Sequence, residues 1–80
     1  MSILFQNIFE VIMFDFGFRL KSIRKSKNLT QKEVAESIKI TERSYQRYEA
    51  NEQKPTHERL VIIADFFDVS LDYLLGRKDL

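Results

Sequence analysis

The chain has 80 residues, of which 44% are hydrophobic, so one small domain is expected and little room is left for a second core. It has no cysteine, which excludes a disulfide framework and a thiolate metal site and is consistent with the reducing cytoplasm. The net charge of +1 conceals an uneven distribution of charge along the chain, because residues 19–59 hold eleven Lys/Arg against six Glu. This basic segment suggests a face attracted to a polyanion, although an ordinary solvated surface can carry the same charges.

Residues 1–15 form an apolar N-terminal extension ahead of the domain that we expect at residues 16–80. The extension has no basic leading region and no small-residue cleavage site, and Glu10 and Asp15 interrupt it. We therefore expect neither a signal peptide nor a membrane span.

The periodicity of this extension does not decide its structure. Phe14, Phe16 and Phe18 alternate like a strand, while the earlier apolar pairs also fit a helix. Packing on the same domain, pairing with a second copy, and an upstream addition before a genuine start at Met13 all stay open. We favour self-association, because a contiguous apolar patch on a small protein usually marks an interface.

Apolar spacing predicts a first helix over about residues 16–27, ending at a left-handed Asn28. A second helix follows Thr30, whose hydroxyl and Glu33 form a capping box. Its predicted buried residues are Val34, Ala35 and Ile38. Lys39 and Ile40 then turn the chain.

Thr41 is the predicted N-cap of a third helix over about residues 42–49. Helical spacing turns Tyr45 and Tyr48 inward. The outward or first-turn positions are Glu42, Arg43, Ser44, Gln46 and Arg47. A helix that only completed a core would need no such polar face, whereas these side chains can bond phosphates and base edges, so the pattern indicates a DNA reader.

Residues 51–55 are a predicted loop, after which Thr56 caps a fourth helix and Ser70 caps a short fifth one. The fourth helix repeats apolar residues at Leu60, Ile63, Ala64 and Phe67, and the fifth carries Leu71, Leu74 and Leu75. The sequence therefore predicts an all-α domain of five helices.

The chain resembles the phage-repressor and Cro-like helix-turn-helix regulators, also called the xenobiotic-response-element family, from about Phe16 to Gly76. The resemblance rests on Arg24, Leu29-Thr30-Gln31, Val34-Ala35, Ile40-Thr41, Tyr48-Glu49, Pro55 and the run Val69-Ser70-Leu71-Asp72-Tyr73-Leu74-Leu75-Gly76. It implies a compact five-helix, lambda-repressor-like DNA-binding domain whose third helix is the recognition helix in the major groove.

By this resemblance the base-reading residues are Glu42, Arg43 and Arg47, with Ser44 and Gln46 within reach of base edges or the backbone. Arg43 is the principal candidate, because a guanidinium can make two parallel hydrogen bonds to guanine. The expected DNA-backbone contacts are Thr30, Gln31, Thr41, Tyr45, Asn51 and Lys54. Capping alone also explains both threonines. The resemblance further implies a structural ion pair between Arg24 and Glu49 beneath the recognition helix.

The sequence departs from the family pattern at three positions. Lys39 and Asn51 stand where glycine is usual, and Phe18 stands where a polar residue is typical. A left-handed backbone at Lys39 would cost roughly 1 kcal/mol, whereas asparagine accepts that conformation readily.

We expect no enzyme, cofactor, metal site or small-molecule substrate. His57 is the only histidine and is expected to be a solvated residue in the first turn of the fourth helix, and the carboxylates form no paired pocket. The expected function is sequence-specific binding of double-stranded DNA as a transcriptional repressor, with a protein-interaction module of antitoxin-like or adaptor type as the alternative.

A homodimer is expected, because two recognition helices related by a twofold axis can address half-sites about 34 Å apart. Besides the N-terminal extension, the candidate interface is the cluster of Leu71, Tyr73, Leu74 and Leu75. The same residues could instead close the core over the first helix.

Overall fold

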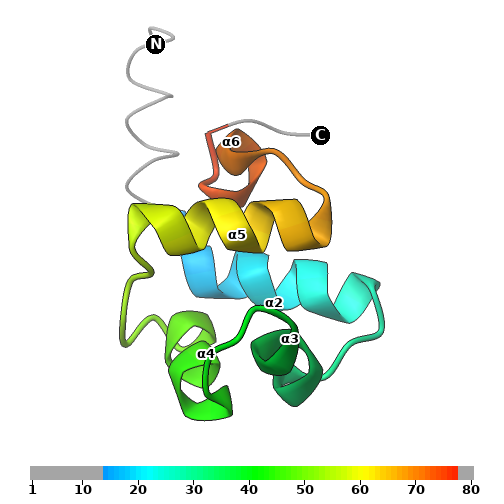
Figure 1. Ribbon diagram of the computed structural model, residues 1–80. Coiled ribbons are helices and arrows are strands. Elements are labelled where there is room, and N and C mark those ends of the chain that lie inside the picture. The colour runs from blue at the N-terminus through cyan, green and yellow to red at the C-terminus, as the bar shows by residue number, and fades with distance from the viewer. Residues whose placement is uncertain (1–13, 78–80) are drawn as a thin grey trace, which may run out of the picture.

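A computed structural model describes residues 14–77 as a bundle of short helices (Figure 1). The helices are α2 (Phe16–Ser26), α3 (Gln31–Ser37), α4 (Glu42–Glu49), α5 (His57–Phe67) and α6 (Leu71–Leu74). No strand occurs in this part of the chain. The predicted all-α fold of five helices is confirmed for the described residues, and the predicted helices coincide with the observed ones to within a few residues.

Each of the five described helices begins at a polar side chain that accepts the backbone N–H three residues on, which satisfies one donor of the exposed first turn. These N-caps are Asp15, Thr30, Thr41, Thr56 and Ser70. Thr30 also forms the predicted reciprocal box, since its own N–H donates to Glu33 Oε1 at 2.9 Å and its Oγ1 accepts from Glu33 N at 3.0 Å. The sequence predicted four of the five caps and omitted Asp15.

Each described helix is also followed by a residue in the left-handed conformation, after which a backbone N–H donates to a carbonyl oxygen five residues back, at 2.8–3.3 Å. The left-handed residues are Asn28, Lys39, Asn51, Asp68 and Gly76. Only Gly76 is glycine. Lys39, with φ +62°, is the least suited of the five, so the strain expected at this turn is present.

The core lies where the helices meet. Its buried residues are Leu20, Ile23, Val34, Ala35, Ile38, Tyr45, Tyr48, Ile63, Ala64, Phe67 and Leu74. Figure 1 shows α3 and α4 together on the side of α2 and α5 that faces away from α6. The helix pair that carries the polar candidate residues thus forms one side of the domain.

The first described residues belong to this fold and do not form a strand. Phe16 and Phe18 lie in α2, where Phe18 is 69% exposed, so the strand interpretation was wrong for this stretch. The Phe14 ring lies against Gly76, where a Cβ atom would collide with it. The predictions for residues 1–13, including self-association and a start at Met13, lie outside the described residues.

The cluster near the C-terminus is divided between two roles. Leu74 is fully buried in the core, as the core-closing alternative predicted, while Leu71 and Leu75 are half-buried. The guanidinium of Arg19 lies 4.0 Å from the centroid of the Tyr73 ring and donates to the Tyr73 carbonyl oxygen at 2.7 Å. Leu74 is therefore unavailable to an interface, and Tyr73 is already covered on one face.

Candidate nucleic-acid interface

The helix α4 presents the predicted polar face to solvent. Its tyrosines Tyr45 and Tyr48 are buried, and Ser44 is half-buried. The exposed side chains are Glu42, Arg43, Gln46 and Arg47. Because residues three and four apart share one side of a helix, two buried tyrosines leave the remaining positions on the outside. Four of the five predicted base readers are thus free to meet a ligand, and two of them are cationic.

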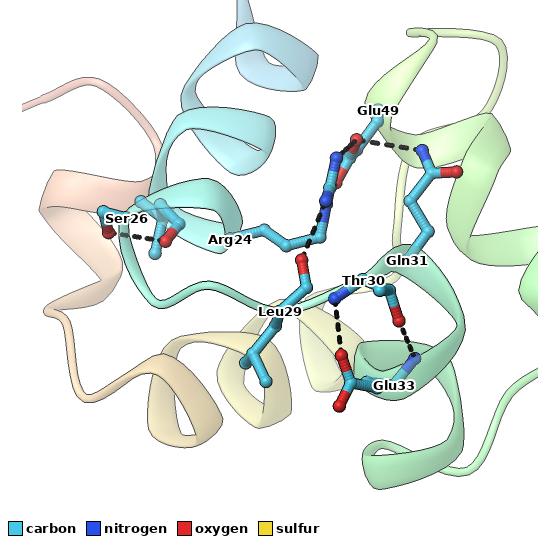
Figure 2. Close-up of polar contacts among 8 residues, drawn as sticks. Arg24, Ser26, Leu29, Thr30, Gln31, Glu33 and Glu49 are labelled. Carbon is cyan, nitrogen blue, oxygen red and sulfur yellow. Dashed lines mark hydrogen bonds and ion pairs between the residues drawn. The ribbon is translucent and has the colours of Figure 1, made fainter.

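An ion pair beneath α4 fixes its last turn to α2 (Figure 2). Arg24 donates from Nε to Glu49 Oε2 at 2.7 Å and from Nη2 to Glu49 Oε1 at 3.1 Å. The third guanidinium nitrogen, Nη1, donates to the carbonyl oxygen of Leu29 at 2.9 Å. Such a two-pronged contact fixes direction as well as distance. The structural pair that the resemblance implied is therefore formed.

The carboxylate of Glu49 stays ionised in this setting. Burial by itself would raise the pKa of Glu49, but the hydrogen bonds to the charged form, chiefly from Arg24, outweigh it and hold the pKa below its ordinary value of 4.5. The same bond raises the pKa of Arg24. The pair is therefore fully charged at neutral pH.

Gln31, the first residue of α3, also reaches this pair. Its Nε2 donates to Glu49 Oε1 at 3.0 Å, and Figure 2 shows the amide drawn toward Glu49. The side chain thereby joins α3 to α4. A phosphate contact through the second N–H of Gln31 stays a prediction. The neighbouring Thr30 is exposed and its hydroxyl caps α3, and its phosphate contact stays a prediction too.

The first turn of α4 is held by local bonds. Thr41 Oγ1 accepts from Ser44 N at 3.1 Å and donates to Ser44 Oγ at 2.9 Å. The side chain of Ser44 is therefore partly committed to the cap, whereas Thr41 stays exposed at the helix start. Base or phosphate contact by either residue stays a prediction.

One predicted DNA-backbone residue, Tyr45, is buried. Tyr45 is 0% exposed, so a direct phosphate contact by this side chain was a wrong prediction, and helical spacing had already turned it inward. Burial, together with the neighbouring Glu49, raises the pKa of Tyr45 far above its ordinary value, and its hydroxyl oxygen has no hydrogen-bond partner within the described residues. The tyrosine is a core residue beneath the exposed polar side of α4.

The side chain of Asn51 makes contacts within the domain that the sequence did not predict. Its Oδ1 accepts from Gly17 N at 2.9 Å and its Nδ2 donates to Asp15 Oδ1 at 2.8 Å. Both ends of the amide thus bond to the start of α2, while the side chain is exposed and Nδ2 carries a second N–H, so its contact with phosphate stays a prediction. The left-handed backbone expected for it is present, with φ +59°.

Lys54 is exposed and follows the recognition helix in the chain. It borders a surface groove of about 320 Å³ whose other lining residues are Phe14, Phe16, Asn51, Pro55, Leu60 and Leu75. The ammonium is free to meet a phosphate, as predicted, but no contact in the structure tests this.

Sequence reasoning missed the contribution of Asp15 and Gly17. Asp15 was assigned to the apolar extension, although an aspartate just before a helical pattern is a standard N-cap signal. Its hydrogen bonds, the largest from Asn51, lower the pKa of Asp15. Nothing local in the sequence indicates that Gly17 packs against the Glu49 carbonyl oxygen, where no Cβ atom fits.

Other kinds of site find no support in the described part of the chain. His57 is exposed at the start of α5, as expected. Among residues 14–77, no three His, Asp or Glu side chains are grouped closely enough to hold a metal ion. The helices described here are too short or too polar to cross a bilayer.

Comparison with known proteins gives the family. Residues 20–74 match the helix-turn-helix family. YobD of Bacillus subtilis, an uncharacterized HTH-type transcriptional regulator, is 48% identical over 61 residues, which are 76% of this chain and 54% of that protein. The cryptic phage CTXphi transcriptional repressor RstR of Vibrio cholerae is 48% identical over 59 residues, 74% of this chain and 53% of that protein.

A more distant relative is named for the opposite effect on transcription. The HTH-type transcriptional activator BcrR of Enterococcus faecalis is 33% identical over 66 residues, 82% of this chain and 32% of that protein. The chain spans about half the length of YobD and RstR. No solved structure matches it. The family match and these identities agree with the five-helix fold and the exposed polar face of α4, and they show that the chain belongs to the helix-turn-helix family of the phage-repressor and Cro-like type.

Proposed function

We propose that the chain is a sequence-specific DNA-binding regulator of transcription that reads the major groove with α4. The observation that carries the proposal is the division of α4 into a buried tyrosine side and an exposed polar side with Arg43 and Arg47. A helix fits the major groove, and a guanidinium that reaches a guanine edge supplies roughly 1–3 kcal/mol of discrimination against the wrong base.

Arg43 is the proposed principal base reader, with Arg47 and Gln46 beside it. Glu42 would accept from cytosine N4, or else weaken binding by repelling phosphate. Thr41, Lys54 and the start of α3 would contact the backbone and set the register. The proposed activity is binding of DNA in the cytoplasm, and no catalytic role is proposed.

Repression is the proposed outcome. A small domain that occupies an operator obstructs polymerase without further parts, and RstR is named a repressor. Because BcrR is named an activator, family membership does not decide the direction. Transcription in vitro from a promoter that overlaps the bound site, with and without the protein, distinguishes the two effects.

A homodimer is also proposed, since one short helix reads only a few base pairs. Among the described residues, α5 exposes Val61, Ile62 and Phe66, which gives a second copy an apolar surface to pack on. The same surface, with Phe18 of α2, keeps a protein-interaction module as the second candidate function. Mass measurement in solution over a range of concentrations tests the dimer.

Selection of a duplex from a randomised pool, followed by a salt titration, tests DNA binding directly. The logarithm of the binding constant should fall against the logarithm of salt concentration by about 0.9 per contacted phosphate. Arg43→Ala should flatten the preference for the enriched duplex over a scrambled one, whereas Lys54→Ala should weaken both alike and reduce the slope. Arg77→Ala removes the same charge just after α6, on the far side of the molecule from α4, and should change neither (Figure 1).

The result that overturns the base-reading assignment is an equal loss on both duplexes from Arg43→Ala. Failure of the unaltered chain to enrich any duplex, with capture of a protein partner through α5, would favour the interaction module instead.

A further inference from the structure

Asn51 joins the end of α4 to the start of α2. The residue lies in the left-handed turn after the recognition helix, and its side chain crosses to a segment 34–36 residues earlier. Its Oδ1 takes the N–H of Gly17 at 2.9 Å, and its Nδ2 gives a hydrogen to Asp15 Oδ1 at 2.8 Å. The same Asp15 oxygen accepts from Phe18 N at 2.9 Å as the cap of α2.

The backbones also meet at this point. The carbonyl oxygen of Glu49 lies against Gly17 so closely that a Cβ atom on Gly17 would overlap it. The N–H of Gly17 is one of the first-turn donors that have no partner within a helix, and Asn51 satisfies it. The contact therefore combines a close backbone approach with two side-chain hydrogen bonds from one amide.

We propose that Asn51 is a positioning residue for DNA binding, acting through Asp15 and Gly17 to fix the direction of α4 instead of contacting the duplex. The inference rests on the proposed function. It brings Asp15, which sequence reasoning placed outside the domain, into the unit that reads DNA.

The geometry of α4 makes its direction important. A helix of eight residues is roughly 12 Å long, so a tilt of about 5° at its last turn moves the first turn by about 1 Å. The first turn holds Glu42 and Arg43. Hydrogen bonds to a base edge weaken steeply with such a displacement, while contacts with flexible phosphate partners tolerate it better. Loss of the contact should therefore reduce sequence preference more than general DNA binding.

The experiment is a double-mutant cycle on DNA affinity. Asn51→Gly keeps the left-handed backbone and removes both hydrogen bonds, and Asp15→Ala removes one partner. Each variant and the double variant are titrated with the duplex enriched by the unaltered chain and with a scrambled duplex, at a temperature where circular dichroism shows them folded. We expect about a fivefold loss on the enriched duplex from each single change, and a loss in the double variant smaller than the two losses combined, because both changes break the Asn51–Asp15 hydrogen bond while Asp15→Ala also removes the cap of α2.

A second measurement reports on the contact without DNA. Hydrogen exchange at the Gly17 amide, followed by NMR, should accelerate about tenfold in Asn51→Gly, since that N–H then has no partner. Asp15→Asn keeps the acceptor oxygen that Asp15→Ala removes, so its DNA affinity and sequence preference should match those of the unaltered chain. Asn28→Gly is the matched control, because Asn28 has φ +58° in the turn after α2 and its side chain makes no hydrogen bond within the described residues.

The outcomes separate the alternatives. Additive losses in the cycle, or equal losses on both duplexes, indicate a direct contact of Asn51 with DNA and overturn the positioning role. The positioning role is also overturned if Asn51→Gly binds the enriched duplex with unchanged affinity while hydrogen exchange at the Gly17 amide is faster. If Arg43→Ala loses sequence preference while Asn51→Gly does not, only this inference fails, whereas failure of the unaltered chain to bind any duplex removes the proposed function itself.

Discussion

Removing Arg24 should cost the domain much of its stability. In Arg24→Ala, Glu49 loses two charge-assisted hydrogen bonds, at 2.7 and 3.1 Å, and the carbonyl oxygen of Leu29 loses its donor. Gln31 alone would remain on the carboxylate. The charge of Glu49 would stay buried with one neutral donor, which is the unfavourable case for an ion pair broken from one side.

The magnitude follows from the burial of the pair. The side chains of Arg24 and Glu49 are 10% and 4% exposed. Breaking a fully buried pair costs roughly 3–5 kcal/mol, so the slight exposure places this one at about 3 kcal/mol. For a domain of this size each kcal/mol moves the melting temperature by about 4–8 °C, which gives a decrease of about 12–24 °C. A domain of this length has only about 4–12 kcal/mol in total.

Thermal and urea unfolding followed by circular dichroism measure this loss. Glu49→Gln keeps an acceptor for Gln31 and removes the charge, so the cycle with Arg24→Ala should show a coupling of at least about 1 kcal/mol. Arg43→Ala, an exposed arginine in α4, is the matched control and should change stability by less than about 0.5 kcal/mol. A melting temperature within about 4 °C of the unaltered chain in Arg24→Ala, or additivity in the cycle, would refute the reasoning.

Three further predictions concern single positions. Lys39→Gly should stabilise the domain by about 1 kcal/mol, because glycine adopts the left-handed conformation of this turn without strain. Lys32→Gly in α3 should destabilise the domain by about the same amount, so the urea midpoints of the two variants should move in opposite directions. Gly17→Ala should destabilise the domain by about 1–3 kcal/mol despite the better helix propensity of alanine, because the added Cβ meets the Glu49 carbonyl oxygen. Ser22→Ala, at an exposed site of the same helix, should cause no loss of stability in thermal unfolding of the two variants. The pKa of Glu49 lies below its unfolded value, so its contribution to stability is present above about pH 4.5 and is lost as the pH falls through the folded pKa. The stability difference between the unaltered chain and Glu49→Gln should shrink as the pH falls below about 4.5, and a constant difference would contradict the assignment.

The helices could be predicted from the sequence because their signals are local. Thr30, Thr41, Thr56 and Ser70 each stand directly before an apolar repeat, and the structure uses all four as caps. The inward direction of Tyr45 followed from helical spacing, and the wrong phosphate assignment arose when the family pattern was applied against that spacing.

The contacts between helices could not be read in the same way. The pairing of Arg24 with Glu49 was predicted only through the family resemblance. The two residues are 25 positions apart, and no local pattern in the sequence indicates that they are in contact. The contact of Asn51 with Asp15 and Gly17 was missed for the same reason. A partner chosen by tertiary packing leaves no periodic signal in the chain.

These long-range polar contacts converge on one end of α4. The ion pair, the Gln31 amide and the Asn51 amide all hold its last turn or the turn that follows it, while the first turn is held by the local bonds of Thr41 and by the buried Tyr45. Because contacts that determine stability and side chains that face solvent occupy different positions of the helix, the exposed residues at 42, 43, 46 and 47 can change with little effect on the fold. The direction of the helix and the identity of its exposed side chains are thus set separately, and under the proposed function a domain built this way would acquire a new DNA sequence preference without losing the contacts that hold the helix.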